Sequence, residues 1–391
     1  MNRILKILLM FLKSRYIFKL PKEKKILIFD DTSFDDIKHI FKDFDYLILQ
    51  SRVQNINKIY VTAGLIFNVF KNYKGNLLTA YIISLIQIIK PKVVFTYIDN
   101  SYKFSEVARS LSKKIKFVAL QNGARHEIKE NDYMFKKKLI KRNLNNFFFI
   151  PYLLCFGKSE ISLYKKCNIK VNKFKTVGYI RLENYLNYYQ KKIKKKKVKK
   201  YDICLLSDVG AWSKNLESEK LKSKFALLAK YCIRFSLKFN KKFILVFKRP
   251  FGNESYEEEQ NLYKKFLTLN EYKYLRKRSK FKKGKDKFGT YDTMRESKIV
   301  VGTMSTLLRE NIAIGGKTLV CNTTGNQTYN FPIKSKFFIE CKTYYEFEKH
   351  LLQLLKLSDK NYRKYTNSKA LISNFNTSEI VKKELKNLTN L

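Results

Sequence analysis

The residues best suited to bind a ligand lie in a turn between an apolar run and a helical pattern. The stretch reads "SKIVVGTMSTLLREN". A helix start leaves backbone N–H groups unpaired and carries partial positive charge, so it favours a phosphate. No capping box engages the glutamate one turn inside the helix, so we expect it to face the ligand and to accept hydrogen bonds from a ribose diol. The alternative is that the serine only caps the helix. The candidate ligand-binding residues are Gly302, Thr303, Ser305, Thr306 and Glu310.

A second polar cluster follows the apolar run "KFVAL". The stretch "QNGARHE" begins with a polar turn and continues with an arginine, a histidine and a glutamate. Histidine and glutamate are the side chains best suited to remove a proton from a sugar hydroxyl. A lone histidine is more often structural, so both interpretations stay open for His126. The candidate residues of this cluster are Gln121, Asn122, Gly123, Arg125, His126 and Glu127.

A pair of cations ends a third apolar run, "FILVFKRP". Lys248 and Arg249 stand directly before Pro250. Two cations at a strand end can clamp a diphosphate or a carboxylate. In a chain this basic, the alternative of two solvated surface charges stays open.

Several other kinds of site are excluded by missing motifs. The chain has no GxGxxG after an early strand, no GxxxxGK[ST] and no GxSxG, which argues against an NAD site, a P-loop and a hydrolase elbow. Its six cysteines include no CxxC pair, and it has only three histidines. We therefore expect no zinc site, no disulfide framework and no bound cofactor.

The elements that must position these residues alternate between short apolar runs and helical patterns. Runs that are apolar throughout are typical of parallel strands buried on both faces. Such alternation predicts an α/β fold with two doubly wound, Rossmann-like domains. The expected strands are 25–31, 46–51, 92–99, 116–123, 153–157, 174–179, 201–208, 243–250, 298–303 and 317–322. The expected helices are 76–90, 102–114, 131–145, 158–167, 214–239, 256–268 and 305–314.

Strand ends provide further candidates, because ligands of open α/β sheets bind beyond the carboxyl ends of the strands. In the first half this rule adds Asp31 and Asp99, and in the second half it adds Ser207 and Asp208. The run "QKKIKKKKVKKYD" separates the two halves and reads as a solvated linker.

The formal charge of +48 favours anionic partners. Lysine greatly outnumbers arginine, which is more typical of biased codon usage and a solvated surface than of specific nucleic-acid binding. The first 20 residues combine basic side chains with a short apolar core. This segment predicts an amphipathic helix that either rests on a membrane surface or packs on the first domain.

The ordered series "KFVALQNGARHE", "LLCFGKSEISLYKKCNIKVNKFKTVGYIRLENY", "FILVFKRP" and "SKIVVGTMSTLLRENIAIGGKTLVCN" resembles bacterial GT-B-fold glycosyltransferases that build lipopolysaccharide and capsule. It is more distantly similar to CDP-glycerol glycerophosphotransferases, bacterial sialyl- and Kdo-transferases and UDP-GlcNAc 2-epimerases. The likeness covers roughly residues 90–325. It implies two domains facing a cleft, and catalysis without a bound metal.

The resemblance also implies roles for individual residues. Ser305 and Thr306 match the turn that binds the donor phosphate, and Glu310 matches the glutamate that binds ribose. Arg249 stands where relatives have a histidine before proline, and Asn122 stands where many have the histidine before glycine. The catalytic base is therefore His126, Glu127 or an acid such as Asp31. Gln121, Asn122, Gly123 and Arg125, with Asp99, fall on the acceptor side.

The domain organisation that follows has an acceptor-side domain, a basic linker, a donor-nucleotide domain and C-terminal helices that can cross back over the first domain. Their expected bounds are 1–190 (with an amphipathic helix at 1–20), 191–200, 201–342 and 343–391. We expect a transferase at the cytoplasmic face of the cell membrane. It would move a sugar from a nucleotide-activated donor to a surface polysaccharide or lipid-linked acceptor. The alternatives are a nucleotide-sugar epimerase of the same fold and a basic nucleic-acid-binding protein.

Overall fold

The structure, a computed structural model, describes residues 11–52, 55–125, 148–167, 169–192, 198–208, 216–247, 254–280 and 288–390. The chain divides into two compact units. The first comprises Met1–Asn184 and Ser373–Leu391, and the second comprises Tyr185–Ile372. The boundary falls inside helix α7 (Ile180–Lys192), upstream of the linker expected at 191–200.

The first unit is built on a six-stranded parallel sheet in the order β3-β2-β5-β6-β7-β8. The chain moves outward from β2 to β3 and then returns to β5, so the direction of winding reverses between β2 and β5. The strands are β2 (Ile26–Ile28), β3 (Tyr46–Ile48), β5 (Val93–Thr96), β6 (Lys116–Leu120), β7 (Phe148–Cys155) and β8 (Ile169–Thr176). A separate two-stranded sheet pairs β1 (Arg15–Ile17) with β4 (Lys58–Tyr60).

Both faces of the first sheet are covered by helices. Alternate strand residues such as Leu27 and Val94 face one core, and their neighbours Ile26 and Val93 face the other. The first core also contains residues of α2 (Ala63–Asn72), α3 (Leu77–Ile89), α4 (Tyr102–Leu111) and α6 (Lys158–Lys166). The second contains residues of the 3-10 helix η2 (Lys38–Phe41), which follows η1 (Phe34–Asp36), and of α7 and α16 (Thr377–Thr389). Burial on both faces explains why these strands are apolar throughout.

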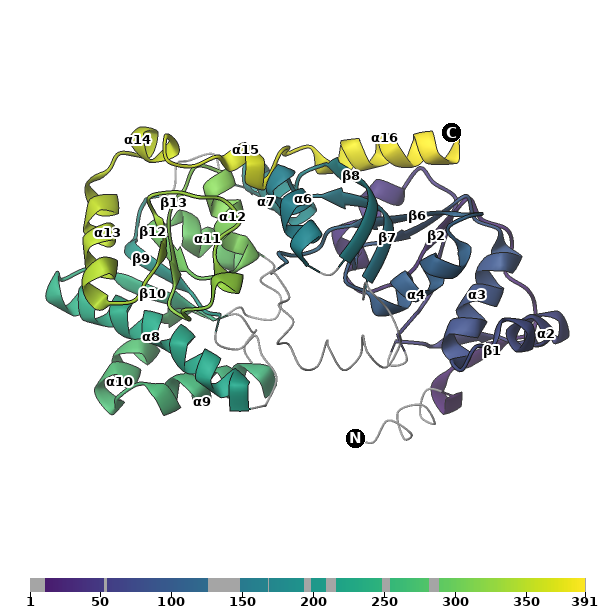
Figure 1. Cartoon of the computed structure of the whole chain (residues 1–391), viewed down its shortest axis with the longest axis horizontal. Helices are drawn as coiled ribbons and strands as arrows, with labels where there is room; N and C mark the ends of the chain where they lie inside the picture. The colour runs from purple at the N-terminus through teal and green to yellow at the C-terminus, as the bar shows by residue number, and fades with distance from the viewer. Residues whose placement is uncertain are drawn as a thin grey trace. The chain divides into compact units, whose positions relative to one another are not determined.

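Helix α16 belongs to the first unit although it ends the chain (Figure 1). Val381 and Leu385 are fully buried in the core beneath the first sheet. Full burial of such side chains contributes roughly 1.5–3 kcal/mol each. Glu384 accepts hydrogen bonds from Tyr152 of β7 and from Lys175 of β8. The last helix therefore supplies one wall of the first unit.

The second unit has a six-stranded parallel sheet in the order β11-β10-β9-β12-β13-β14. This is the strand order of a Rossmann fold, and the winding reverses between β9 and β12. The strands are β9 (Tyr201–Leu206), β10 (Phe243–Val246), β11 (Ser279–Lys280), β12 (Ser297–Gly302), β13 (Lys317–Asn322) and β14 (Phe338–Glu340).

Helices cover both faces of the second sheet as well. Leu205 and Val301 face a core shared with α8 (Leu216–Lys238), α9 (Glu254–Phe266), α10 (Leu269–Lys277) and α13 (Tyr344–Lys356). Leu206 and Val300 face a core shared with α11 (Gly289–Arg295) and α12 (Thr306–Ala313). The remaining short helices are η4 (Gln327–Tyr329), α14 (Asp359–Arg363) and α15 (Ser368–Leu371). Two doubly wound α/β sheets are thus present, which confirms the predicted fold class.

The expected strands are found, with differences at their ends. Strand β7 begins at Phe148, five residues before the apolar run at 153–157, and β8 ends at Thr176. The helix expected at 131–145 lies outside the described residues. The helix expected over 1–20 does not continue to its end: residues 11–13 are helical, but Arg15–Ile17 form β1 because their backbone pairs with β4.

All six cysteines are buried free thiols. Within the described ranges, no helix is long and apolar enough to cross a membrane.

Candidate functional site

The carboxyl edge of the second sheet carries the predicted phosphate-binding turn. Strand β12 ends at Gly302, and α12 begins at Thr306 with Ser305 as its N-cap. The Ser305 hydroxyl accepts a long hydrogen bond, 3.4 Å, from the N–H of Leu307. This turn lies where the winding of the sheet reverses, beside the end of β9. That is the position at which open α/β sheets bind ligands.

A carboxylate from the neighbouring strand end fills part of the turn. Asp208, just after β9, accepts hydrogen bonds from the N–H groups of Thr303 and Met304, both at 3.1 Å. The Thr303 hydroxyl donates to the carbonyl of Cys321 at 2.8 Å, and Thr303 is buried. The N–H group of the candidate Thr303, and that of its neighbour Met304, are therefore already engaged. Asp208 fixes the turn instead.

The outer part of the turn is more accessible. Residues 304–307 are half-buried. Within the part of the chain that the structure describes, the Ser305 N–H has no hydrogen-bond acceptor. The Ser305 hydroxyl can also donate while it accepts from Leu307. Two donors of one residue thus remain at the positive end of α12.

Gly302 and Glu310 lie inside the fold. A Cβ atom at position 302 would lie 3.2 Å from Cδ2 of Leu308, so this glycine lets α12 pack closely on β12. Glu310 is buried and accepts a hydrogen bond from the hydroxyl of Tyr291 in α11. Tyr291 in turn stacks on Tyr185, with ring centroids 4.5 Å apart. Lys248 and Arg249 lie outside the described residues.

The carboxyl edge of the first sheet holds an ion pair. Asp99, after β5, is buried and accepts hydrogen bonds from the guanidinium of Arg125, at 2.8 Å from Nε, and from the N–H of Asn122, at 3.0 Å. The Tyr164 hydroxyl donates to the same carboxylate, and Arg125 also donates to the Asn122 side chain at 2.8 Å. Burial alone would lower the pKa of Arg125, but the Asp99 carboxylate outweighs it and raises that pKa. The guanidinium therefore stays charged and holds the turn at 122–125.

Gln121 is buried beneath this turn and has a structural role. Its amide donates to Glu160 at 2.7 Å and to the carbonyl of Gly123 at 2.9 Å, and its oxygen accepts from the N–H of Phe156 at 3.1 Å. The side chain thus ties the ends of β6 and β7 together. Asn122, Gly123 and Arg125 remain half-buried at the surface of the turn.

Asp31 and Asp30 follow β2 in the same unit and have different surroundings. Asp31 is half-buried and accepts amide hydrogen bonds from Gln50 at 3.1 Å and Asn55 at 2.8 Å. Asp30 is buried, and Arg52 donates to it at 2.9 Å. Asp31 forms no ion pair with a described residue. His126 and Glu127 lie outside the described residues.

The structure therefore brings together Asp99 with Gln121–Arg125 in the first unit, and Thr303 with Ser305 in the second. It also shows contacts of Asp208, which the sequence offered only as a strand-end candidate, and of Glu160 and Tyr164, to which the sequence assigned no role. Asp208 had one signal, its position after a strand. Glu160 and Tyr164 had none, because helical spacing does not reveal which helix abuts a strand end. Among the described residues, no group of three or more potential metal ligands occurs.

No protein-family model matches the chain, and no curated protein sequence matches it. Solved structures match its fold. A protein assigned as a UDP-N-acetylglucosamine 2-epimerase from Listeria monocytogenes aligns over 93% of this chain and 96% of its own, with 12% identity and a TM-score of 0.51.

Two other solved structures give similar alignments. The UDP-GlcNAc 2-epimerase of Neisseria meningitidis, bound to UDP-GlcNAc, aligns over 93% of this chain and 99% of its own, with 12% identity and a TM-score of 0.49. The wall teichoic acid polymerase TagF aligns over 94% and 90%, with 9% identity and a TM-score of 0.48. At 12% identity the alignment with the Listeria protein shows the fold alone. The fold is that of GT-B proteins, with two Rossmann-like domains, in agreement with the resemblance seen in the sequence.

Proposed function

We propose that the protein is a metal-independent glycosyltransferase that moves a sugar or sugar-like group from a nucleotide-activated donor to a surface polysaccharide or lipid-linked acceptor. The observation that carries the proposal is the half-buried turn at 304–307, which opens α12 at the point where the second sheet reverses its winding.

The second unit binds the donor in this proposal. The N-terminus of α12 carries about half a positive elementary charge, and the N–H and hydroxyl of Ser305 can donate to a phosphate oxygen. Thr306, also half-buried, adds a hydroxyl at the same end. Lys248 and Arg249 belong to the proposal on the sequence alone, as the cations that offset the charge of the leaving phosphate.

The first unit supplies the acceptor side and the base. Among the described candidates Asp31 is the best base. It is half-buried, and its carboxylate is oriented by two amides, whereas Asp99 is buried and neutralised by Arg125. A base must be accessible to the hydroxyl from which it takes the proton. His126 and Glu127 are the other two candidates. Asn122, Gly123 and Arg125 would contact the acceptor.

Nucleotide binding tests the donor site. We expect one or more of UDP, CDP, CMP and GDP to raise the melting temperature of the wild-type protein. Ser305→Ala should abolish that rise. Ser358→Ala is the matched control, because Ser358 caps α14 in the same unit by accepting from Asn361 at 3.2 Å. Each variant should lose about 1 kcal/mol of stability with its cap, but only Ser305→Ala should lose the nucleotide response. If no nucleotide stabilises the wild type, the proposal is wrong.

The role of Glu310 has its own test. A ribose contact would require its carboxylate to exchange the Tyr291 hydroxyl for the diol. Tyr291→Phe keeps the carboxylate and removes the competing donor. If Glu310 binds ribose, this variant should bind the nucleotide at least as tightly as the wild type, and Glu310→Gln should bind it more weakly. Equal affinity of all three proteins would assign Glu310 to packing alone.

The alternative, a nucleotide-sugar epimerase, differs in its products. The nucleotide sugar that binds best should be incubated with the protein and followed by NMR. An epimerase changes the sugar while the nucleotide stays attached. A transferase releases the nucleotide at a rate that rises when an acceptor glycan is added. Asp31→Asn should lower that rate without weakening nucleotide binding.

A surface on the first unit supports contact with a membrane. Helix α2 exposes Ile66, Phe67 and Phe70 along one side, with Phe67 and Phe70 71% and 76% exposed. Tyr73 and Leu77 extend the exposed apolar surface. Lys71 and Lys74 are exposed beside it. Aromatic side chains flanked by lysines suit the interface of an anionic bilayer. We call residues 66–77 the α2 surface.

Vesicle sedimentation tests this surface. We expect the protein to pellet with phosphatidylglycerol vesicles more than with phosphatidylcholine vesicles, and less at high salt. Phe67→Ser/Phe70→Ser should reduce pelleting. Leu269→Ser/Tyr345→Ser, which changes side chains 65% and 72% exposed in the second unit, should not. Equal pelleting of the two variants would show that charge alone attracts the protein, and the α2 surface would have no role.

A further inference from the structure

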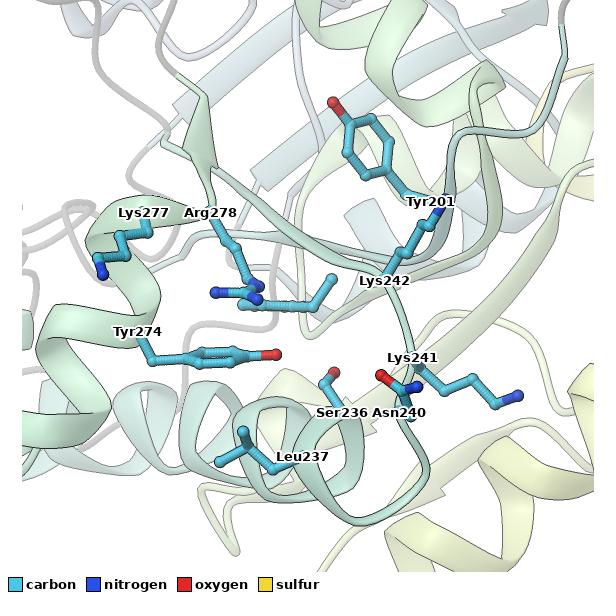
Figure 2. A pocket seen from close by; sticks show the side chains of 10 residues that line it. Tyr201, Ser236, Leu237, Asn240, Lys241, Lys242, Tyr274, Lys277 and Arg278 are labelled. Atoms are coloured by element: carbon cyan, nitrogen blue, oxygen red, sulfur yellow. The ribbon is translucent and has the colours of Figure 1, made fainter.

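A pocket of about 510 Å³ lies at the amino edge of the second sheet (Figure 2). Its walls come from the last turn of α8, the turn into β10, the end of α10 and the first residue of β9. All these strands are parallel, so this edge is opposite to the one that carries Ser305. The pocket is therefore separate from the proposed donor site. Its volume falls in the range of small-molecule sites, roughly 300–1,000 Å³.

The charge of the pocket has one sign. Its lining includes no acidic residue and four basic ones, Lys241, Lys242, Lys277 and Arg278. None of the four forms an ion pair with a described residue. The nearby Asp202 is engaged on its own side by Lys298, at 2.8 Å, and by the N–H of Lys242.

Two helices end at this pocket, and their ends attract cations. Helix α8 ends at Lys238 and α10 at Lys277. The C-terminus of each carries about half a negative elementary charge, so both together offset roughly one of the four cations. A net positive charge of about three remains around the pocket, although the ammonium groups of Lys241 and Lys277 point away from its centre in Figure 2. Helix ends alone therefore do not account for the cluster.

The pocket also holds a buried polar group without a partner. Ser236 is 2% exposed, and its hydroxyl has no hydrogen bond within the described part of the chain. Buried hydroxyl groups are normally satisfied, so an isolated one in a pocket indicates a missing ligand or water. In Figure 2 the hydroxyl groups of Ser236 and Tyr274 point into the same central space.

The arginine is held in place for such a contact. The Arg278 guanidinium lies over the Tyr274 ring, 3.9 Å from its centroid. Stacking of this kind fixes the plane of the guanidinium and leaves its N–H groups directed outward from the ring edge. A pre-oriented guanidinium with lysines around it is suited to the several oxygens of a phosphate group.

We propose that this pocket is a second binding site, for a ligand that carries a phosphate or diphosphate group. Arg278 and the hydroxyl of Ser236 contact the phosphate oxygens. Lys241, Lys242 and Lys277 neutralise its charge. The ligand is either a soluble phosphorylated metabolite or the phosphate of a lipid headgroup, since both present the same group.

Protection of lysines from amine acetylation, read by mass spectrometry on the full chain, tests the site directly. Saturating pyrophosphate should slow the labelling of Lys241, Lys242 and Lys277 by at least about fivefold. Lys356 and Lys360, exposed in the same unit, serve as internal controls and should label at an unchanged rate. Phosphatidic acid vesicles form the second arm. Protection by pyrophosphate alone identifies a soluble ligand, and protection by vesicles alone identifies a headgroup.

Binding measured by calorimetry supplies the second test. Arg278→Ala should weaken pyrophosphate binding about tenfold or more, because it removes a charge-assisted contact. Lys356→Ala/Lys360→Ala removes two charges from the same unit and should change the affinity little. Ser236→Ala should weaken binding without lowering the melting temperature of the free protein, since its hydroxyl has no partner to lose. No protection by either phosphate source, or protection only by an oligonucleotide, would overturn the proposal.

Discussion

The carboxyl edges of the two sheets share one structural feature, but they differ in the residues that stay accessible. In each unit, an aspartate after one strand accepts a hydrogen bond from a backbone N–H in the turn after the neighbouring strand. In the first unit Asp99 holds Asn122, and in the second Asp208 holds Thr303 and Met304. The first carboxylate is also neutralised by the guanidinium of the half-buried Arg125, which lies across the turn. The second leaves the outer turn, with Ser305, at the surface.

Within each turn after a strand, some residues fix the backbone and others stay available to a ligand. The innermost groups of each turn are consumed by the aspartate, which sets the path of the backbone. The residues further along, 305–307 in the second unit and 123–125 in the first, are half-buried, and their N–H groups are not held by the aspartate. The turn of the first unit, held by an ion pair, is consistent with the acceptor side that we propose. The turn of the second unit, where Ser305 keeps hydrogen-bond donors, is consistent with the proposed phosphate site.

The largest loss of stability should come from removing the arginine that holds the turn of the first unit. Arg125→Ala would leave the Asp99 carboxylate buried without its cation, which costs about 3–5 kcal/mol of unfolding free energy. Arg52→Ala is the comparison, because Arg52 also pairs with a buried aspartate but its side chain is 37% exposed against 14% for Arg125. It should cost about 1 kcal/mol. Urea unfolding measures the stability of both variants, and equal losses of unfolding free energy would contradict a special role of Arg125 in holding the turn.

A smaller effect should follow removal of the aspartate in the second unit. Asp208→Ala leaves two backbone N–H groups without their acceptor and should cost about 1–3 kcal/mol. The vacated position suits an anion, so phosphate should restore part of the loss. Asp202→Ala removes a carboxylate that lies within β9, and phosphate should not stabilise this variant specifically. If phosphate shifts the melting temperature of both variants alike, Asp208 does not occupy an anion position.

The smallest effect should be a change in the pH dependence of stability in acid. Burial alone would raise the pKa of Asp30, but hydrogen bonds from Thr32 and Ser51 and the charge of Arg52 outweigh it and lower that pKa. A lowered pKa in the folded state means that the contribution of Asp30 is complete above the unfolded value of about 3.9 and is lost as the pH falls through the folded value. Asp30→Asn should be less stable than the wild type at pH 7, and the gap should narrow below about pH 4. A gap that stays constant with pH would contradict the assignment.

Much of the fold could be predicted from the sequence because its sheets are buried on both faces. Runs such as "ILIF" (26–29) and "ICLL" (203–206) are apolar at every position, and this pattern can be recognised without knowing which strands are neighbours. The strands that escaped prediction, β1, β4, β11 and β14, have two or three residues each, too few for a period to emerge. The return of α16 to the first unit depends on contacts far apart in sequence.

The candidate site was predictable only in part. The position of Ser305 follows from a strand, a glycine and a helix start, which are local signals. The burial of Glu310 depends on packing that local sequence signals do not reveal. Helix α12 buries Leu308, Arg309, Glu310, Asn311 and Ile312 in succession, so no polar face marks the side toward solvent. The hydrogen bond between Asp208 and Thr303 requires β9 and β12 to be neighbours in the sheet. The order of strands cannot be predicted from the sequence of either segment.

Hydrogen exchange read by mass spectrometry tests whether a nucleotide-activated donor binds at the start of α12. With the best-binding nucleotide present, the peptide spanning 302–310 should exchange more slowly, while the peptide spanning 236–246 at the opposite edge should not change. Ser305→Ala should abolish that protection. Protection confined to 236–246, or protection that persists in Ser305→Ala, would contradict the account.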